Sequence, residues 1–310
     1  MPDAVHLKLG TRRSPLAMAQ AEETRRRLCA AHGWDVAAVE LVPVIASGDK
    51  VQDRPLAEIG GKALWTRELD AWLAERRIDA AVHSLKDVET ARPPSLHIAA
   101  ILPRADKRDR LVGAASLAAL PTGAVIGTSA PRRAAQALHL RSDCTIVTFR
   151  GNVATRLAKL AAGEADATFL AAAGLERLGE HGTGHPLDPA EWLPASGQGA
   201  IAIECRADDG PTRDLLAAID HAPSRAEVMA ERALLAALGG DCHSPVAVAC
   251  DFADGRLTMV AALFSPDGAE KVQGDAVFDA GDGESPARLA RDLLSRATPG
   301  ILPYFSGADR

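Results

Sequence analysis

The chain has 310 residues with a formal net charge of −6, and 47% of the residues are hydrophobic. This composition supports packed cores and excludes an intrinsically disordered chain, while the length predicts two or three domains. The acidic balance does not favour nucleic acid as a partner, and no stretch approaches the roughly 18 apolar residues of a membrane span. The five cysteines form no CxxC pair, and the first residues contain no apolar signal core. We therefore expect an unexported, cytoplasmic protein without a zinc ribbon or a disulfide framework.

The first hundred residues alternate between strand and helix patterns. Ser14 and Pro15 suit the N-cap and the first turn of a helix. A proline-rich piece at 92–103 marks a candidate domain boundary. In chain order, the predicted elements are a strand at 5–9, a helix at 16–31, a strand at 39–46, a helix at 63–76 and a strand at 78–82.

The next part of the chain repeats this order of elements. The segment GTRRSP at 10–15 corresponds to GTSAPRR at 127–133, and an Asp-Ala pair begins an apolar strand at 79–82 and again at 166–170. The predicted elements are strands at 124–126, 144–149 and 164–170 and helices at 131–140 and 153–162. Because the same blocks recur in the same order, the sequence predicts two related α/β lobes.

The rest of the chain has a different pattern. A Gly/His/Pro loop at 179–199 precedes a strand at 200–205 and a short helix or hinge at 211–221. The elements predicted beyond it are a helix at 226–238, strands at 246–252, 256–264 and 271–278, and a helix at 286–297. They indicate a small α+β domain. The predicted domains are a discontinuous lobe 1 at 1–103 and 200–221, lobe 2 at 104–199, and the α+β domain at 222–310.

Arginine is strongly preferred to lysine, with 28 arginines against seven lysines. Many of them lie at or near the predicted strand-to-helix turns: Arg12, Arg13, Arg132, Arg133, Arg150, Arg156 and Arg177. Helix N-termini bind anions, and ligands of open α/β sheets lie beyond the carboxyl ends of the strands. Each arginine alone fits a solvated surface, but their recurrence predicts a polyanion held in a cleft between the lobes.

Asp87 and Cys242 are the other candidate functional residues. Asp87 is a lone carboxylate at a strand end beside Lys86, where it fits either a turn cap or a group that stabilises a cation or moves a proton. Cys242 lies in the tight turn LGGDCHSP, which fits either a covalently modified thiol or an ordinary loop cysteine. His83 fits a hydrogen-bonded strand-end histidine. Buried structural thiols are expected at Cys144, Cys205 and Cys250. The sequence has no metal-ligand spacing, P-loop or GxGxxG after a strand.

A set of motifs resembles the porphobilinogen deaminase family, also called hydroxymethylbilane synthases. They are GTRRSPLA at 10–17, GGKALWTREL at 60–69, AVHSLKDV at 81–88, IGTSAPRR at 126–133, RGNVATRL at 150–157, AAAGLERLG at 171–179, GQGAIAIECR at 197–206 and GGDCHSP at 239–245. The resemblance implies an α/β fold with two periplasmic-binding-protein-like lobes and a small C-terminal α+β domain. It also implies a dipyrromethane cofactor, joined by a thioether to Cys242, onto which four porphobilinogen molecules are added with loss of ammonia. Hydrolysis then releases hydroxymethylbilane for tetrapyrrole biosynthesis.

The resemblance also implies residue roles. Cofactor contacts are implied for Lys86, Asp87, Thr128, Ser129, Arg132, Arg133 and Arg156. Substrate contacts are implied for Arg12, Ser14, Gln20, Arg150, Arg156 and Arg177. Asp87 is the implied catalytic residue, which would stabilise the cationic azafulvene and help proton transfer. The implied enzyme is a monomer that acts on a small molecule, without a metal, a nucleic acid or a membrane as partner.

Some positions differ from the family's usual pattern. Ala130-Pro131 replaces a second serine and an aliphatic residue, Ala63 replaces a glycine, and Asp241 precedes the cysteine where glycine is often found. Two other functions fit part of the pattern. A two-lobed anion receptor without catalysis would need the same arginines, and a cysteine hydrolase would need a base oriented by a third residue beside Cys242.

Overall fold

The computed structural model describes residues 5–45, 66–240 and 244–307. The chain divides into two compact units. The first unit comprises Met1–Gln52, Gly61–Ala105 and Gly199–Arg225, and the second comprises Asp53–Gly60, Asp106–Gln198 and Ala226–Arg310. The second unit contains the predicted second lobe together with the predicted C-terminal domain, each with its own sheet. The division into three domains therefore stays a prediction.

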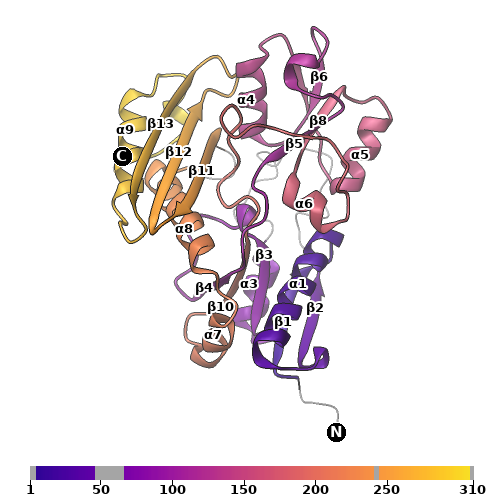
Figure 1. The fold of residues 1–310 in the computed structure, drawn as a ribbon, viewed down its shortest axis with the longest axis vertical. Helices are drawn as coiled ribbons and strands as arrows, with labels where there is room; N and C mark the ends of the chain where they lie inside the picture. Colours follow the sequence, from indigo (N-terminus) through magenta and orange to yellow (C-terminus); the bar gives the residue numbers. More distant parts are fainter. Residues whose placement is uncertain (1–4, 46–65, 241–243, 308–310) are drawn as a thin grey trace. The chain divides into compact units, whose positions relative to one another are not determined.

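The first unit is built on a five-stranded sheet with the order β2-β1-β3-β10-β4 (Figure 1). Strands β1, β2 and β3 are parallel, whereas β10 runs antiparallel to β3 and β4. The strands are β1 Leu7–Arg12, β2 Val39–Val44, β3 Ala80–Ser84, β4 Leu96–Ile101 and β10 Ile201–Arg206. Because three parallel neighbours end at the same edge, the turns after β1 and β3 lie close together.

Strand β4 was not predicted. The proline-rich piece 92–103 was expected to mark a boundary, and a segment of the first unit ends just after it, at Ala105, but β4, an edge strand of the first sheet, lies within the piece. Pro93 and Pro94 precede this strand and Pro103 follows it, so no proline interrupts its ladder of hydrogen bonds. The proline content therefore marks the two ends of a strand.

Helices cover both faces of this sheet. The α1 helix (Pro15–His32) begins as predicted, with Ser14 Oγ accepting the amide of Ala17, and ends at Gly33 in the left-handed region at φ 67°. Helices α1 and α7 (Gly210–Ala217) share one hydrophobic cluster with the sheet, and α3 (Arg67–Ala74) shares another. The 3₁₀ turns are η1 Val36–Ala38 and η3 Leu85–Asp87. The predicted helix at 63–76 begins outside the described residues, so only its second part is tested.

The first sheet of the second unit repeats the strand order of the first unit. Its order is β7-β6-β8-β5-β9, with β6 parallel to β7 and β8, and β5 antiparallel to β8 and β9. The strands are β5 Asp109–Val112, β6 Val125–Gly127, β7 Thr145–Val147, β8 Ala167–Ala171 and β9 His185–Pro186, and the helices are α4 Pro131–Leu140, α5 Val153–Ala161 and α6 Ala172–Arg177, with η4 at Leu117–Ala119. The predicted pair of related α/β lobes is confirmed at this level. Strand β5 was not predicted, because its sequence DRLV is too short and too charged to give a strand pattern.

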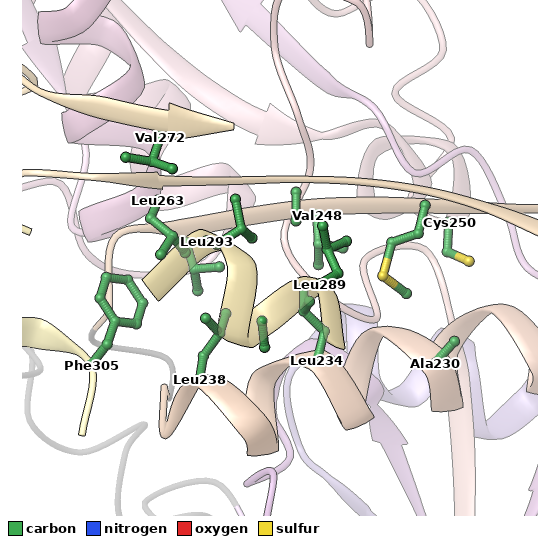
Figure 2. Packing of buried hydrophobic residues seen from close by; sticks show 14 of the residues in the cluster. Ala230, Leu234, Leu238, Val248, Cys250, Leu263, Val272, Leu289, Leu293 and Phe305 are labelled. Carbon is green, nitrogen blue, oxygen red and sulfur yellow. The ribbon is translucent and has the colours of Figure 1, made fainter. Parts of the chain in front are cut away.

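The second unit also contains the predicted α+β fold. Its antiparallel sheet has the order β11-β12-β13, and the elements are α8 Ala222–Leu238, β11 Val246–Ala253, β12 Arg256–Phe264, β13 Lys271–Asp279, α9 Ser285–Arg296 and η5 Leu302–Tyr304. Figure 2 shows the core of this part, where Leu234 and Leu238 of α8 and Leu289 and Leu293 of α9 meet side chains of the sheet, among them Val248. The α/β class with a small C-terminal α+β part is confirmed. In the described stretches, no helix is long and apolar enough to cross a membrane.

Candidate functional site

A pocket in the first unit brings together several of the predicted site residues. It is lined by Arg12, Ser14, Leu16, Ala17, Gln20, Val82, His83, Ser84 and Asp87. These residues come from the end of β1, the first turns of α1, and the end of β3 with η3. Since β1 and β3 are parallel neighbours, the sheet itself places these turns side by side.

Asp87 and Arg12 form the charged part of this pocket. Arg12 Nη1 lies 3.9 Å from Asp87 Oδ2, and the two side chains are 20% and 36% exposed, respectively. Lys86, the neighbour of Asp87 on the same 3₁₀ turn, is half-buried. A carboxylate that is accessible and held beside a cation can receive a positively charged or N–H-bearing group.

Gln20 and Ser84 form the polar wall of the pocket. The Gln20 side-chain amide donates to Ser84 Oγ at 2.8 Å, and Ser84 Oγ donates to Gln20 Oε1 at 3.1 Å. Gln20 is buried, although it was predicted as a substrate contact. Ser84 was not predicted as a site residue, and the signal that could have found it is its place in the motif AVHSLKDV. Ser14 serves as the cap of α1 at the pocket mouth.

In the second unit, Arg132 and Arg133 are buried and bind a carboxylate that the sequence did not single out. Arg132 Nη2 donates to Asp109 Oδ2 at 2.8 Å, and Arg133 Nη2 donates to Asp109 Oδ1 at 2.7 Å. The indole of Trp192 and the amide of Gln198 also donate to Asp109, each at 2.9 Å. Burial alone raises the pKa of Asp109, but attraction by the two arginines overcomes this effect and holds that pKa far below its usual range.

The charge of this cluster is not balanced. Among the residues that the structure describes, two guanidinium groups pair with this one carboxylate, so the three groups together carry one net positive charge. Burial lowers the pKa of Arg132, whereas the attraction of Asp109 raises it. A buried excess of positive charge at a helix N-terminus is the arrangement that binds an anion. The nearest carbonyl partners, Leu193 O and Phe169 O, accept from Arg132 and Arg133 and fix where the two side chains lie.

The other predicted residues of the second unit follow its parallel strands. Thr128 and Ser129 come after β6, and Thr128 is buried, with its hydroxyl accepting the amide of Ala130 at 3.2 Å. Arg150 is buried just after β7, and Arg156 Nε donates to Gly151 O at 3.1 Å. Arg177 is half-buried at the end of α6, the helix that follows β8. Because β6, β7 and β8 are parallel, these turns share one edge of the sheet.

Cys242 lies outside the described residues, so its predicted thioether stays a prediction. The described flanks are the end of α8 at Leu238 and the start of β11 at Val246, with Gly239 at φ 63° between them. The expected buried thiols at Cys144, Cys205 and Cys250 are confirmed. Burial raises the pKa of Cys205 to about 11, so this thiol is unreactive at neutral pH.

The predicted site residues thus fall into two sets. Arg12, Ser14, Gln20, Lys86 and Asp87 belong to the first unit, and Thr128, Ser129, Arg132, Arg133, Arg150, Arg156 and Arg177 belong to the second. The structure brings Arg12, Ser14, Gln20 and Asp87 together at one pocket and Arg132 and Arg133 together at Asp109. The expected cleft between the lobes stays a prediction.

Comparison with known families decides what kind of protein carries these sites. The family model "Porphobilinogen deaminase, dipyromethane cofactor binding domain" matches residues 7–214, and "Porphobilinogen deaminase, C-terminal domain" matches residues 225–295. The chain belongs to the porphobilinogen deaminase family. The resemblance seen in the motifs is confirmed, and an enzyme is favoured over an anion receptor or a cysteine hydrolase.

Individual relatives agree with this family. Porphobilinogen deaminase from Sphingopyxis alaskensis is 59% identical over 306 residues, which cover 97% of this chain and 96% of the relative. Porphobilinogen deaminase from Paracoccus denitrificans is 48% identical over 302 residues, which cover 96% of each chain. Among solved structures, a periplasmic substrate-binding protein of an ABC transporter from Coxiella burnetii matches with a TM-score of 0.42 and 16% identity, over 73% of this chain and 94% of that chain.

The second-unit arginines fit the cofactor of the deaminase family. A dipyrromethane carries acetate and propionate side chains, and carboxylates pair well with guanidinium groups. Arg132, Arg133 and Asp109 together carry a net positive charge, which attracts the negatively charged carboxylates of such a cofactor. Buried Arg150 after β7 adds a further cation to the same sheet edge.

Proposed function

We propose that this chain is the transferase that joins four porphobilinogen molecules head to tail, releases ammonia at each addition, and hydrolyses the product to hydroxymethylbilane. This reaction belongs to tetrapyrrole biosynthesis, which leads to haem and chlorophyll. The observation that carries the proposal is the pocket of the first unit, where the accessible carboxylate of Asp87 lies beside Arg12 in a chain that belongs to the deaminase family.

Asp87 is the proposed catalytic residue. Loss of ammonia from porphobilinogen leaves a cationic pyrrole, and a carboxylate nearby stabilises developing positive charge. Its Oδ atoms also accept pyrrole N–H groups and hold a proton on its way to or from the reacting carbon. Arg12, at 3.9 Å from this carboxylate, lines the same pocket.

The arginines are proposed to bind the carboxylates of the substrate. Each porphobilinogen brings an acetate and a propionate, so chain growth adds negative charge at every step. We assign substrate contacts to Arg12, Ser14, Gln20, Arg150, Arg156 and Arg177. A guanidinium group holds a carboxylate with two parallel hydrogen bonds, which fixes orientation as well as position.

The cofactor is proposed to be a dipyrromethane attached to the sulfur of Cys242. When bound, it supplies the free pyrrole carbon to which the first substrate is joined. We assign its contacts to Lys86, Asp87, Thr128, Ser129, Arg132, Arg133 and Arg156. The excess positive charge around Asp109 supports this assignment for Arg132 and Arg133, because the cofactor's carboxylates neutralise it.

The proposal includes the setting of the enzyme. We infer a cytoplasmic monomer that acts on a small molecule and needs neither a nucleic acid nor a membrane. The net charge of −6 supports the absence of a nucleic-acid partner.

Mass spectrometry tests the proposal directly. The intact protein, purified under reducing conditions, should be heavier than its sequence by two pyrrole units, and the tryptic peptide that contains Cys242 should carry the adduct. Incubation with porphobilinogen should release ammonia and hydroxymethylbilane. A bare chain that neither carries an adduct nor consumes porphobilinogen would refute the proposal.

A further inference from the structure

One buried carboxylate binds both flanks of the segment that carries Asp87. Glu204, on β10, is fully buried. His83 Nε2, four residues before Asp87, lies 3.2 Å from Glu204 Oε2. Arg92, five residues after Asp87, donates through Nε to Glu204 Oε1 and through Nη2 to Glu204 Oε2, each at 2.9 Å. Glu204 therefore touches both sides of the turn that presents Asp87, through hydrogen bonds from Arg92 and a close approach of His83.

The alternation of side chains along the strands directs the side chains of this anchor away from the α1 face of the sheet. Ala80 and Val82 of β3 pack in the cluster that includes α1, whereas Ala81 packs with α3. His83 is two residues after Ala81 on the same strand, so its side chain points toward the same α3 face. Ser84 points toward α1, where its hydroxyl donates to Gln20. Arg92 and Glu204 therefore hold the turn without lining the pocket, whereas His83 is one of the residues that line it.

Arg92 extends the anchor to two further elements. Its Nη2 donates to Asp70 of α3 at 2.6 Å, and its Nη1 donates to Glu89 at 2.7 Å. Glu89, two residues after Asp87, also accepts the hydroxyl of Thr66 at 3.0 Å. The guanidinium group thus joins β10, α3 and the segment that follows Asp87. A lysine ammonium is a single point charge and cannot make these contacts with the same geometry.

Arg92 and Glu204 are both charged at neutral pH. Burial alone lowers the pKa of Arg92, but hydrogen bonds and attraction from Glu204 and Asp70 raise it above its ordinary value. Burial alone raises the pKa of Glu204, but His83 and Arg92 lower it from 4.5 to about 2. Removal of Arg92 would leave three carboxylates facing one another without their shared cation, which forces the segment to move.

The turn itself needs this support. The η3 turn, Leu85–Asp87, is one turn of 3₁₀ helix, a form with weaker hydrogen bonds than an α-helix. Its backbone bonds include Leu85 N to Ala200 O at 3.1 Å and Val88 N to Leu85 O at 3.1 Å. Reacting groups must be held to within a fraction of an ångström for efficient reaction.

We propose that Arg92 is a positioning residue of the enzyme, which, together with Glu204, holds the 83–92 segment so that Asp87 keeps its place at the pocket. This inference rests on the proposed catalytic role of Asp87. Arg92 does not line the pocket and is not part of the motif AVHSLKDV at 81–88.

The test compares Arg92→Met with a matched control in the same unit. Arg225 also binds a carboxylate, Asp220, at 2.7 Å, and it donates to Ala99 O at 2.8 Å and Ile98 O at 3.2 Å, both on β4 and outside the 83–92 segment. Steady-state rates should be measured on protein whose cofactor loading is checked by intact mass, at a temperature where each variant is folded. Arg92→Met should lower kcat at least about tenfold while KM for porphobilinogen changes less than about threefold. Arg225→Met should lose thermal stability but keep kcat within about twofold.

Three further measurements separate positioning from stability. Amide hydrogen exchange in the 85–91 segment should become faster in Arg92→Met and stay unchanged in Arg225→Met. Arg92→Lys is the milder variant and serves if Arg92→Met does not fold. Its kcat should lie between those of Arg92→Met and the parent, because a lysine ammonium cannot reproduce the bidentate contact with Glu204. When Asp87→Asn is already present, adding Arg92→Met should lower kcat by a further factor of less than about two. The reason is that Arg92 acts on turnover through the position of Asp87.

The outcomes distinguish the two proposals. If Asp87→Asn keeps its turnover, the proposed role of Asp87 is wrong. If Asp87→Asn loses its turnover while Arg92→Met and Arg92→Lys both keep kcat within about twofold of the parent, only the positioning role is overturned. The positioning role would also be overturned if the double variant lost kcat by the product of the two single-variant losses, because the two residues would then act independently.

Discussion

Asp87 and Asp109 show how surroundings decide what a carboxylate can do. Asp109 is fully buried, and its oxygens accept hydrogen bonds from two arginines, an indole and an amide. Asp87 is 36% exposed at the edge of a pocket, with Arg12 at 3.9 Å. Asp109 therefore serves to hold other residues, whereas Asp87 is accessible to a ligand.

The residue-scale prediction concerns Asp87→Asn. The amide keeps the shape of the carboxylate but cannot neutralise a cation or take up a proton, so kcat for hydroxymethylbilane formation should fall at least about 100-fold. The folded state should survive, because the side chain lies at the surface of the pocket. An assay of hydroxymethylbilane formation measures kcat, and circular dichroism measures whether the variant is folded.

Asp79→Asn is the matched control for this variant. Asp79 lies just before the opposite end of the same strand, where its carboxylate accepts the amide of Lys8 at 2.8 Å, and an asparagine oxygen accepts the same bond. Its turnover should stay within about twofold of the parent. Near-normal turnover of Asp87→Asn would count against the catalytic assignment.

At the scale of elements, the strand-to-helix turns position the arginines. Helix α5 begins after Asn152, whose side chain accepts the amide of Thr155 at 2.9 Å. Gly151 before it has φ 103°, a conformation that favours glycine, and its carbonyl accepts Arg156 Nε. The cap thus fixes both the start of the helix and the base of a proposed ligand contact.

The element-scale prediction concerns this cap. Asn152→Ala should lower the free energy of unfolding by about 1 kcal/mol, because the amide of Thr155 loses its acceptor. Asn152→Asp should retain most of the stability, since a carboxylate accepts the same bond and suits the positive end of the helix dipole. Urea denaturation of both variants measures the difference. Equal losses in the two variants would show that the cap is not the cause.

At the scale of the whole molecule, each unit contains a buried carboxylate that accepts hydrogen bonds from arginine. Glu204 has this role in the first unit, with His83 and Arg92, and Asp109 has it in the second, with Arg132 and Arg133. Both carboxylates have a lowered pKa in the folded chain. The stability of both units is therefore linked to pH in the same direction.

The whole-molecule prediction is a loss of stability in acid. The pKa of Glu204 is about 2 in the folded chain against an ordinary value of 4.5, so the stability it confers is complete above pH 4.5 and is lost as the pH falls toward 2. This group alone accounts for roughly 3 kcal/mol. Urea denaturation across this pH range measures the loss. Glu204→Gln should be less stable at neutral pH and show a shallower dependence below pH 4.5, and an unchanged slope would contradict the linkage.

The sequence predicted the elements better than it predicted their partners. The cap at Ser14, the repeated lobe pattern and the α+β segment follow from local periodicity, and all three are observed. Strand β4 within 92–103 was not predicted, because prolines at strand ends look like prolines in a linker, although a segment of the first unit does end just after this piece, at Ala105. Strand β5 and its Asp109 were missed, because a short charged strand has no periodic signal.

The sequence by itself determined the family and the turns that carry the arginines and Asp87, because motifs and periodicity are local properties of the chain. Only the tertiary structure decided which charged side chains pair with one another. Arg133 meets Asp109 across 24 positions, and Arg92 meets Glu204 across 112. Such pairs depend on which strands lie side by side in a sheet, and spacing along the chain carries no record of that arrangement.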